Sequence, residues 1–132
     1  MIGLDTNVII RYITQDDHGQ SAQATQFIET ELSDKEPGYI TLITLVEVVW
    51  VLESCYQQSS DTIIAVIQQL LTTSQLVVEQ TDVAYIALKR MSDGDKVDFS
   101  DALIAVISEK EGCQKVVTFD KKATKVGMTL LG

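Results

Sequence analysis

The sequence predicts an α/β fold built on a mostly parallel sheet. Short apolar runs at 76–78 and 116–118 have the length and the valine-rich composition of buried strands. Segments with helical spacing lie between such runs, and one of them carries Ile63, Ile67 and Leu70 on a single face. Strands that alternate with helices in this way are typical of parallel α/β sheets. At 132 residues, we expect one domain covering 1–132.

The first half of the chain is predicted to begin with a strand and to contain three helices. We expect a strand at 2–5, a helix through 8–13, a break at 16–20, a helix from near Ser21 to 32, a polar turn at 33–38, a very short strand at 39–40 and a helix from Thr41 or Thr44 to Ser54.

The second half is predicted to alternate helices and strands in the same manner. We expect a helix capped by Ser60 or Asp61, a strand at 76–78, a helix capped by Thr81 or Asp82, a turn at 92–95, a long helix opened by Asp98 and ended by Gly112, a strand at 116–118 and an edge strand at 128–131.

The composition is that of a soluble globular protein with an acidic balance. Hydrophobic residues make up 45%, no apolar stretch reaches the ~20 residues of a membrane span, and we expect a cytoplasmic protein without a secretory leader. Cys55, Cys113 and Trp50 are interpreted as core residues. The net charge of −9 argues against a nucleic-acid partner unless a local basic rim overrides it, and it favours a cation site or a basic protein partner.

Acidic residues recur at the edges of the apolar segments. Glu47 is the single charge between Pro37 and Leu52, so we expect a buried carboxylate that is paired or bound to a metal. The others follow or open predicted core elements: Asp5, Asp98, Asp101 and Asp120. Asp5 and Asp120 come at the carboxyl ends of strands, where ligands of parallel sheets collect. The pattern favours one shared cation site.

Each acid also has a purely structural explanation. Thr44 and Glu47 fit a capping box, although a helix that begins at Thr41 would rule this out. Asp98 and Asp101 would complement a helix dipole. Asp5 and Asp120 would cap the segments that follow them. We prefer one common cause to several independent ones.

A hard cation is the common cause that suits this set of oxygen donors. Mg²⁺ or Mn²⁺ would relieve the repulsion among clustered carboxylates and would activate water near a phosphodiester. Asn7 and Thr118 would support the site by hydrogen bonding. The sole histidine, His18, falls in a predicted polar turn, and the sequence has no Gly-rich phosphate loop.

Four segments in register resemble the PIN-domain ribonucleases, and more narrowly the toxin of a VapBC-type toxin–antitoxin pair. They are Gly3-Leu4-Asp5-Thr6-Asn7-Val8, Leu45-Val46-Glu47-Val48-Val49-Trp50-Val51-Leu52, Asp98-Phe99-Ser100-Asp101-Ala102-Leu103-Ile104-Ala105 and Val117-Thr118-Phe119-Asp120. The resemblance covers essentially the whole chain. It implies a three-layer sandwich with a central parallel sheet of about five strands flanked by helices.

The same resemblance implies a site, a reaction and partners. Asp5, Glu47, Asp101 and Asp120 would hold one or two Mg²⁺ or Mn²⁺ ions, with Asp98 as an additional acid that is not ranked cleanly against Asp101. The reaction would be hydrolysis of an RNA phosphodiester, and the partners would be a VapB-like antitoxin and a second copy of the chain. Candidate contacts to the RNA backbone are Arg11, Lys121, Lys122 and Lys125, for which plain surface solvation is at least as good an explanation.

Two other classes of protein share some of these features. A signalling receiver domain has the same size, acidity and α/β pattern, but it needs a phosphoacceptor Asp after a middle strand, where this chain has Glu79. A PIN-like module without metal would use its carboxylates only to dock a basic partner. Manganese-dependent RNA cleavage would separate these alternatives.

Overall fold

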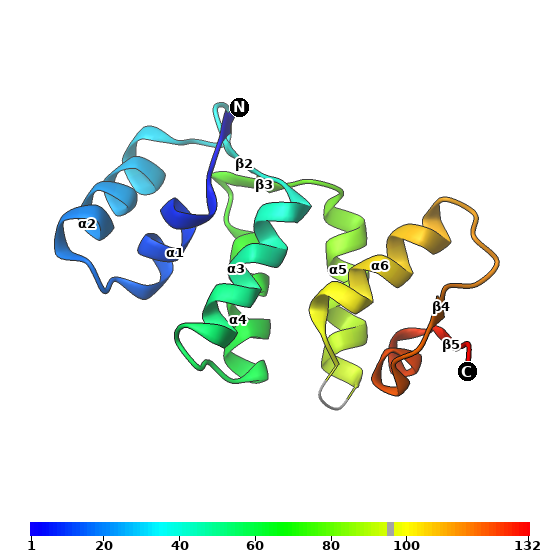
Figure 1. Cartoon of the computed structure of the whole chain (residues 1–132). Helices are drawn as coiled ribbons and strands as arrows, with labels where there is room; N and C mark the ends of the chain where they lie inside the picture. The colour runs from blue at the N-terminus through cyan, green and yellow to red at the C-terminus, as the bar shows by residue number, and fades with distance from the viewer. Residues whose placement is uncertain (95–96) are drawn as a thin grey trace. The chain divides into compact units, whose positions relative to one another are not determined.

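The computed structural model describes residues 1–94 and 97–132, which divide into two compact units. The N-terminal unit is Met1–Thr81 and the C-terminal unit is Asp82–Gly132. The elements follow one another along the chain as Figure 1 labels them. In the N-terminal unit they are β1 (Ile2–Gly3), α1 (Thr6–Thr14), α2 (His18–Gln26), the π-helix η1 (Phe27–Glu31), β2 (Gly38–Ile40), α3 (Leu42–Ser54), α4 (Ser60–Thr72) and β3 (Leu76–Val78).

The C-terminal unit holds the remaining helices and strands. They are α5 (Thr81–Asp93, whose first residue belongs to the N-terminal unit), α6 (Phe99–Lys110), β4 (Val117–Thr118), the 3₁₀ helix η2 (Lys121–Val126) and β5 (Thr129–Leu130). The first two residues of the expected turn at 92–95 are helical, because α5 continues to Asp93, and Asp95 lies outside the described residues.

The strands pair in parallel, as the sequence predicts, but they form two sheets. One sheet has the order β1-β2-β3, with Ile2 opposite Gly38 and Tyr39 opposite Val77. The other consists of β4 and β5. The α/β class is therefore confirmed, with the five expected strands divided three and two in the described chain. The argument that placed Asp5 and Asp120 at one sheet edge does not apply, because β1 and β4 belong to different sheets.

The core of the N-terminal unit is formed by apolar residues on helices that pack on the sheet and on one another. Helix α1 packs on α2 and α3, and α4 packs on α3 and β3. Ile9, Leu45, Ile63 and Ile67 are almost fully buried there. Each buried side chain of this size contributes about 1.5–3 kcal/mol relative to an exposed one.

Two helix starts differ from the sequence-based expectation for local reasons. Helix α2 begins at His18, not near Ser21, because the Asp17 side chain accepts a hydrogen bond from the Gln20 amide at 2.9 Å and caps the helix. Helix α4 is capped by Ser59, one residue before the predicted cap. The predicted break does separate α1, which ends at Thr14, from α2, but His18, Gly19 and Gln20 already belong to the first turn of α2.

Three residues expected in the core are exposed. Trp50 is 63% exposed on α3. Cys55 and Cys113 are exposed free thiols, because the first lies at the C-terminal end of α3 and the second follows the end of α6. In the described part of the chain, no helix has both the length and the apolar character needed to cross a bilayer.

Candidate functional site

Asp5 lies just beyond β1 and caps α1. Its backbone is extended, and its Oδ1 accepts a hydrogen bond from the Thr6 amide at 2.7 Å. The capping bond uses one of the two carboxylate oxygens. Next to it, Thr6 Oγ1 is buried without a hydrogen-bond partner among the described residues, and such a group is normally satisfied by water or a ligand. Asp5 itself is exposed, so it is both a cap and an accessible carboxylate.

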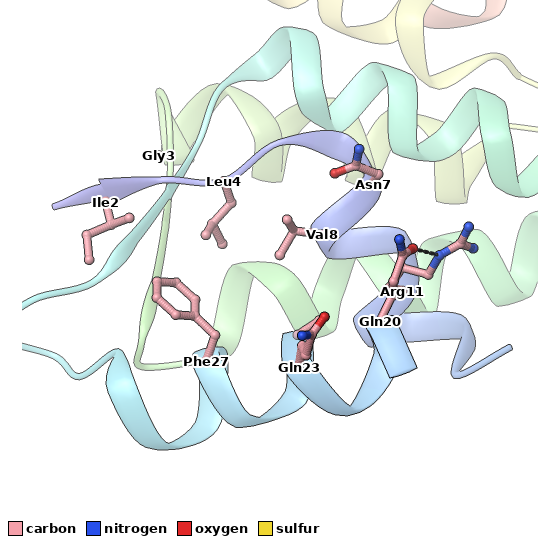
Figure 2. A pocket seen from close by; sticks show the side chains of 10 residues that line it. Ile2, Gly3, Leu4, Asn7, Val8, Arg11, Gln20, Gln23 and Phe27 are labelled. Carbon is pink, nitrogen blue, oxygen red and sulfur yellow. Dashed lines mark hydrogen bonds between the residues drawn. The ribbon is translucent and has the colours of Figure 1, made fainter. Parts of the chain in front are cut away.

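A cavity of about 450 Å³ lies between β1, α1 and α2 in the same unit (Figure 2). Val8 and Phe27 form apolar parts of its wall, and Asn7 and Arg11 line it from α1. None of the residues that line it is acidic. The cavity is therefore adjacent to the Asp5 motif in sequence, but it is not a carboxylate site.

Arg11 is engaged in a hydrogen-bond network within the N-terminal unit. Its Nε donates to Gln20 Oε1 at 2.8 Å, as Figure 2 shows, and its guanidinium lies 3.2 Å from Asp16 Oδ1. Tyr56 donates to the other oxygen of Asp16 at 2.5 Å. Hydrogen bonds from Tyr56 and Thr14, together with the charge of Arg11, lower the pKa of Asp16. Arg11 thus has a structural role. The sequence pattern gave no sign of the contact between Asp16 and Tyr56, because these residues are 40 positions apart.

Glu47 lies in the second turn of α3, where it cannot be part of a capping box. Thr41 is the N-cap, and its Oγ1 accepts a hydrogen bond from the Thr44 amide at 3.1 Å. The capping-box explanation is therefore wrong. The expectation of burial is also wrong, because Glu47 is exposed on the same helix face as Ile43 and Trp50. An apolar helix with one open face can carry a charge without the burial penalty.

Glu79 is a functional cap that the sequence analysis missed. Its Oε1 accepts a hydrogen bond from the Leu42 amide at 2.8 Å, so a residue just after β3 satisfies a backbone donor at the start of α3. The local sequence pattern could not indicate this hydrogen bond, because Leu42 and Glu79 are 37 positions apart. The cap holds the first turn of the helix that carries Glu47.

Asp98 and Asp101 occupy the first turn of α6 and differ in environment. Asp98 is the N-cap, and its Oδ1 accepts hydrogen bonds from the amide and the hydroxyl of Ser100, both at 3.0 Å. Asp101 is half-buried. Burial, followed by the negative charges of Asp98 and Asp120, raises the pKa of Asp101 above its usual value. The structure therefore brings these three carboxylates close enough to interact electrostatically within the C-terminal unit.

Asp120 is held by its neighbours on both sides. Its amide donates to Thr118 Oγ1 at 3.0 Å, and its Oδ1 accepts from the Lys122 amide at 2.9 Å, which caps the 3₁₀ helix η2. Thr118 thus fixes the backbone at Asp120, and its supporting role at a metal site stays a prediction. Asp120 is exposed at the end of β4 and adds negative potential near Asp101.

The donor set fits a hard cation in its chemistry. All five acids supply oxygen, and the pKa of Asp101 is raised by burial and then by the negative charges of Asp98 and Asp120, which a divalent ion would offset. In neither unit do three His, Cys, Asp or Glu side chains of residues 1–94 and 97–132 approach closely enough to hold one metal ion.

The basic residues are distributed unequally between the two units. Residues 1–81 contain eleven acids and two Lys or Arg, for a net charge of −9, whereas 82–132 contain eight of each and are neutral. Lys121, Lys122 and Lys125 are exposed beside Asp120. The net charge of the whole chain therefore comes from residues 1–81, and the C-terminal unit carries a local basic segment at 121–125.

Comparison with protein-family models places the chain among the nucleases. The model of the PIN domain matches residues 2–128, which is nearly the whole chain and includes both units. The chain therefore belongs to the PIN-domain family, an α/β family whose members are generally nucleases that use divalent metal ions. Comparison with curated proteins and with solved structures gives no significant match.

Proposed function

We propose that this chain is a single-domain, Mg²⁺- or Mn²⁺-dependent endoribonuclease that acts as the toxin of a type II toxin–antitoxin pair. The observation that carries the proposal is the family match over 2–128 together with an acid at every motif position that the family uses. Membership of this family also removes the receiver domain as an alternative.

The proposed metal ligands are Asp5, Glu47, Asp101 and Asp120, with Asp98 as an additional acid at the same site. The electrostatic coupling of Asp101 to Asp98 and Asp120 supports this assignment for the C-terminal unit. We favour Asp101 as the ligand of the pair, because it is half-buried in the first turn of α6 and interacts electrostatically with both Asp98 and Asp120. When bound, the metal would activate a water molecule and neutralise charge on the phosphodiester.

The remaining residues bind and orient the substrate in this proposal. Thr118 fixes the backbone at Asp120, and Asn7 on α1 presents an amide beside the Asp5 motif. Lys121, Lys122 and Lys125 bind the RNA backbone electrostatically. Arg11 is a weaker candidate for this role, because Asp16 already neutralises its charge.

The proposed partners follow from charge and family. A basic antitoxin of the VapB type complements the N-terminal unit, which carries the whole net charge of −9. A small basic reading frame immediately upstream of the gene would support this partner. We further propose a homodimer and a cytoplasmic location, where the exposed thiols of Cys55 and Cys113 would stay reduced.

RNA cleavage by the purified protein tests the proposal. We expect cleavage that requires Mn²⁺ or Mg²⁺, is lost in EDTA and is abolished by Asp5→Asn, which keeps a side chain able to cap α1. Asp34→Asn is the matched control, because Asp34 is an exposed acid in the turn before β2. Calorimetry should show weaker Mn²⁺ binding by Glu47→Gln. Metal-independent RNA or peptide binding without cleavage would instead identify a catalytically silent binding module.

A further inference from the structure

We propose that Phe119 is a stacking platform for an unpaired base of single-stranded RNA, and that Lys121 and Lys122 bind the neighbouring phosphates. The inference depends on the proposed function in one respect, which is that the bound nucleic acid is RNA. It concerns the C-terminal unit alone, and it adds a selective contact beside the proposed ligand Asp120.

Phe119 presents an aromatic ring to solvent at the end of β4. Its exposed fraction is 80%, whereas Phe99 is fully buried and Phe27 is half-buried. Of the three phenylalanines, Phe119 is thus the one whose side chain is exposed in the described chain. A ring in contact with water gains little stability for the fold, so its position is better explained by a partner with a flat apolar face.

The backbone on both sides of Phe119 is fixed by hydrogen bonds. The Leu131 amide donates to the Thr118 carbonyl at 2.7 Å, and the Asp120 amide donates to Thr118 Oγ1 at 3.0 Å. The Asp120 cap on η2 orients the chain that follows. Phe119 therefore projects from a rigid junction between a strand pair and a helix, and a preorganised ring loses less entropy on binding.

The charge around Phe119 is complementary to a polyanion. The segment 115–125 contains four lysines and a single acid, Asp120. Lys121 and Lys122 are exposed, and neither forms an ion pair with an acid of the described residues. An exposed aromatic ring with lysines close to it in the chain has the two usual elements of a single-strand binding surface, a face for base stacking and positive charge for the backbone. The exposed Val117 and Leu131 would also suit a protein partner, but the lysines favour RNA.

Stacking at this position has a consequence for substrate choice. A base can stack on Phe119 only when it is unpaired and rotated out of a helix, so duplex RNA should be a poor ligand. Because every base has a flat face, the contact should discriminate weakly among the four bases. The contact would thus select an unpaired nucleotide, which would lie beside the backbone that Thr118 fixes at Asp120.

Fluorescence anisotropy with a short single-stranded oligoribonucleotide in EDTA tests the stacking contact without cleavage. Phe119→Leu should weaken binding about 5-fold or more, and Phe119→Tyr should restore it, because loss of one stacking contact is expected to lower affinity by this much. Ile43→Ala is the matched control, since Ile43 is 75% exposed on α3 of the acidic unit, and this variant should bind like the wild type. Urea unfolding should be the same for all three variants and the wild type.

A second pair of variants tests the electrostatic part. Lys122→Ala should reduce the slope of log affinity against log salt by about 1. Lys89→Ala should leave the slope unchanged, because Lys89 is paired with Asp93.

Several outcomes would overturn the inference. They are equal affinity of Phe119→Leu and the wild type, equal affinity of the wild type for single-stranded and duplex RNA, and failure of Phe119→Tyr to restore binding. Absence of RNA binding by the wild type at low salt would do the same. If binding depends on Phe119 but Mn²⁺ produces no cleavage, the nuclease proposal fails and the stacking contact stands. If cleavage occurs with an unchanged KM in Phe119→Leu, the stacking contact fails and the nuclease proposal stands.

Discussion

At the scale of the residue, the five candidate acids divide into caps and non-caps. Asp5, Asp98 and Asp120 each accept a hydrogen bond from a backbone amide at a helix start. Glu47 and Asp101 have no such bond among the described residues, and Asp101 has a raised pKa. The capping explanations weighed from the sequence are therefore right for Asp5, Asp98 and Asp120. Asp101 lies in the first turn of α6, where the helix-dipole explanation also holds, and Glu47 is an exposed acid on α3.

Asp101→Asn should make the metal-free protein more stable at neutral pH. Burial and the charges of Asp98 and Asp120 raise the pKa of the Asp101 carboxyl above its usual 3.8, so the folded state holds this proton more tightly than the unfolded chain does. Stability is consequently lost as pH rises through the range between the two pKa values, and the amide avoids this loss. Urea titrations should show a gain above that range and none well below 3.8. A less stable variant at neutral pH would contradict the electrostatic account.

Tyr56→Phe should destabilise the N-terminal unit in a pH-dependent way. The hydrogen bond from Tyr56 lowers the pKa of Asp16 below 3.8, so its stabilising effect is present above that value and is lost as pH falls through the folded-state pKa. The unfolding free energies of variant and wild type should differ at neutral pH and converge in acid. Thr62→Ser, on the exposed start of α4, serves as a conservative control. A difference that persists unchanged in acid would assign the effect to packing.

At the scale of the element, α3 shows which features of a helix its sequence pattern can predict and which it cannot. The pattern predicts its C-terminal limit and offers two starts, of which the structure selects the one at Thr41. It could not predict that the face with Ile43, Glu47 and Trp50 is exposed, because an almost uniformly apolar helix gives no periodicity from which to read a buried side. Similarly, the strand β3 (Leu76–Val78) has the predicted bounds, whereas the cap from Glu79 onto α3 could not be predicted locally.

Thr41→Ala should lower the free energy of unfolding by about 1 kcal/mol, because the Thr44 amide loses its capping acceptor at the start of a helix that packs on α1 and α4. Thr41→Ser keeps the hydroxyl and should restore most of the loss. Denaturant titration measures both variants. Equal stability of the alanine variant and the wild type would show that Glu79, which accepts from the Leu42 amide, is sufficient to cap α3.

At the scale of the whole molecule, charge is the property that the composition alone misrepresents. The net charge of −9 argues against an RNA partner, yet residues 82–132 are neutral and carry eight of the ten Lys and Arg. The excess acid lies within 1–81, where clustered negative charges repel one another.

Monovalent salt should therefore raise the thermal stability of the protein while it weakens RNA binding. Between low ionic strength and about 1 M the screening length falls from about 30 to 3 Å, so repulsion within 1–81 is relieved and Tm should rise by a few degrees. Calorimetry at increasing KCl measures this. Asp34→Lys reduces the acid excess and should reduce the response. A Tm that falls with salt would mean that ion pairs such as Arg90–Glu109 outweigh the repulsion.

The sequence by itself determined the α/β class, most element positions and the family, because these depend on short-range periodicity and on motifs in fixed order. It also identified Asp5, Glu47, Asp98, Asp101 and Asp120 as unusual. Only the tertiary structure decided that α3 has an exposed face and that the strands form two sheets. It also decided that burial and the charges of Asp98 and Asp120 raise the pKa of Asp101. These features arise from contacts between residues distant in the chain, and no local pattern records which distant groups will meet.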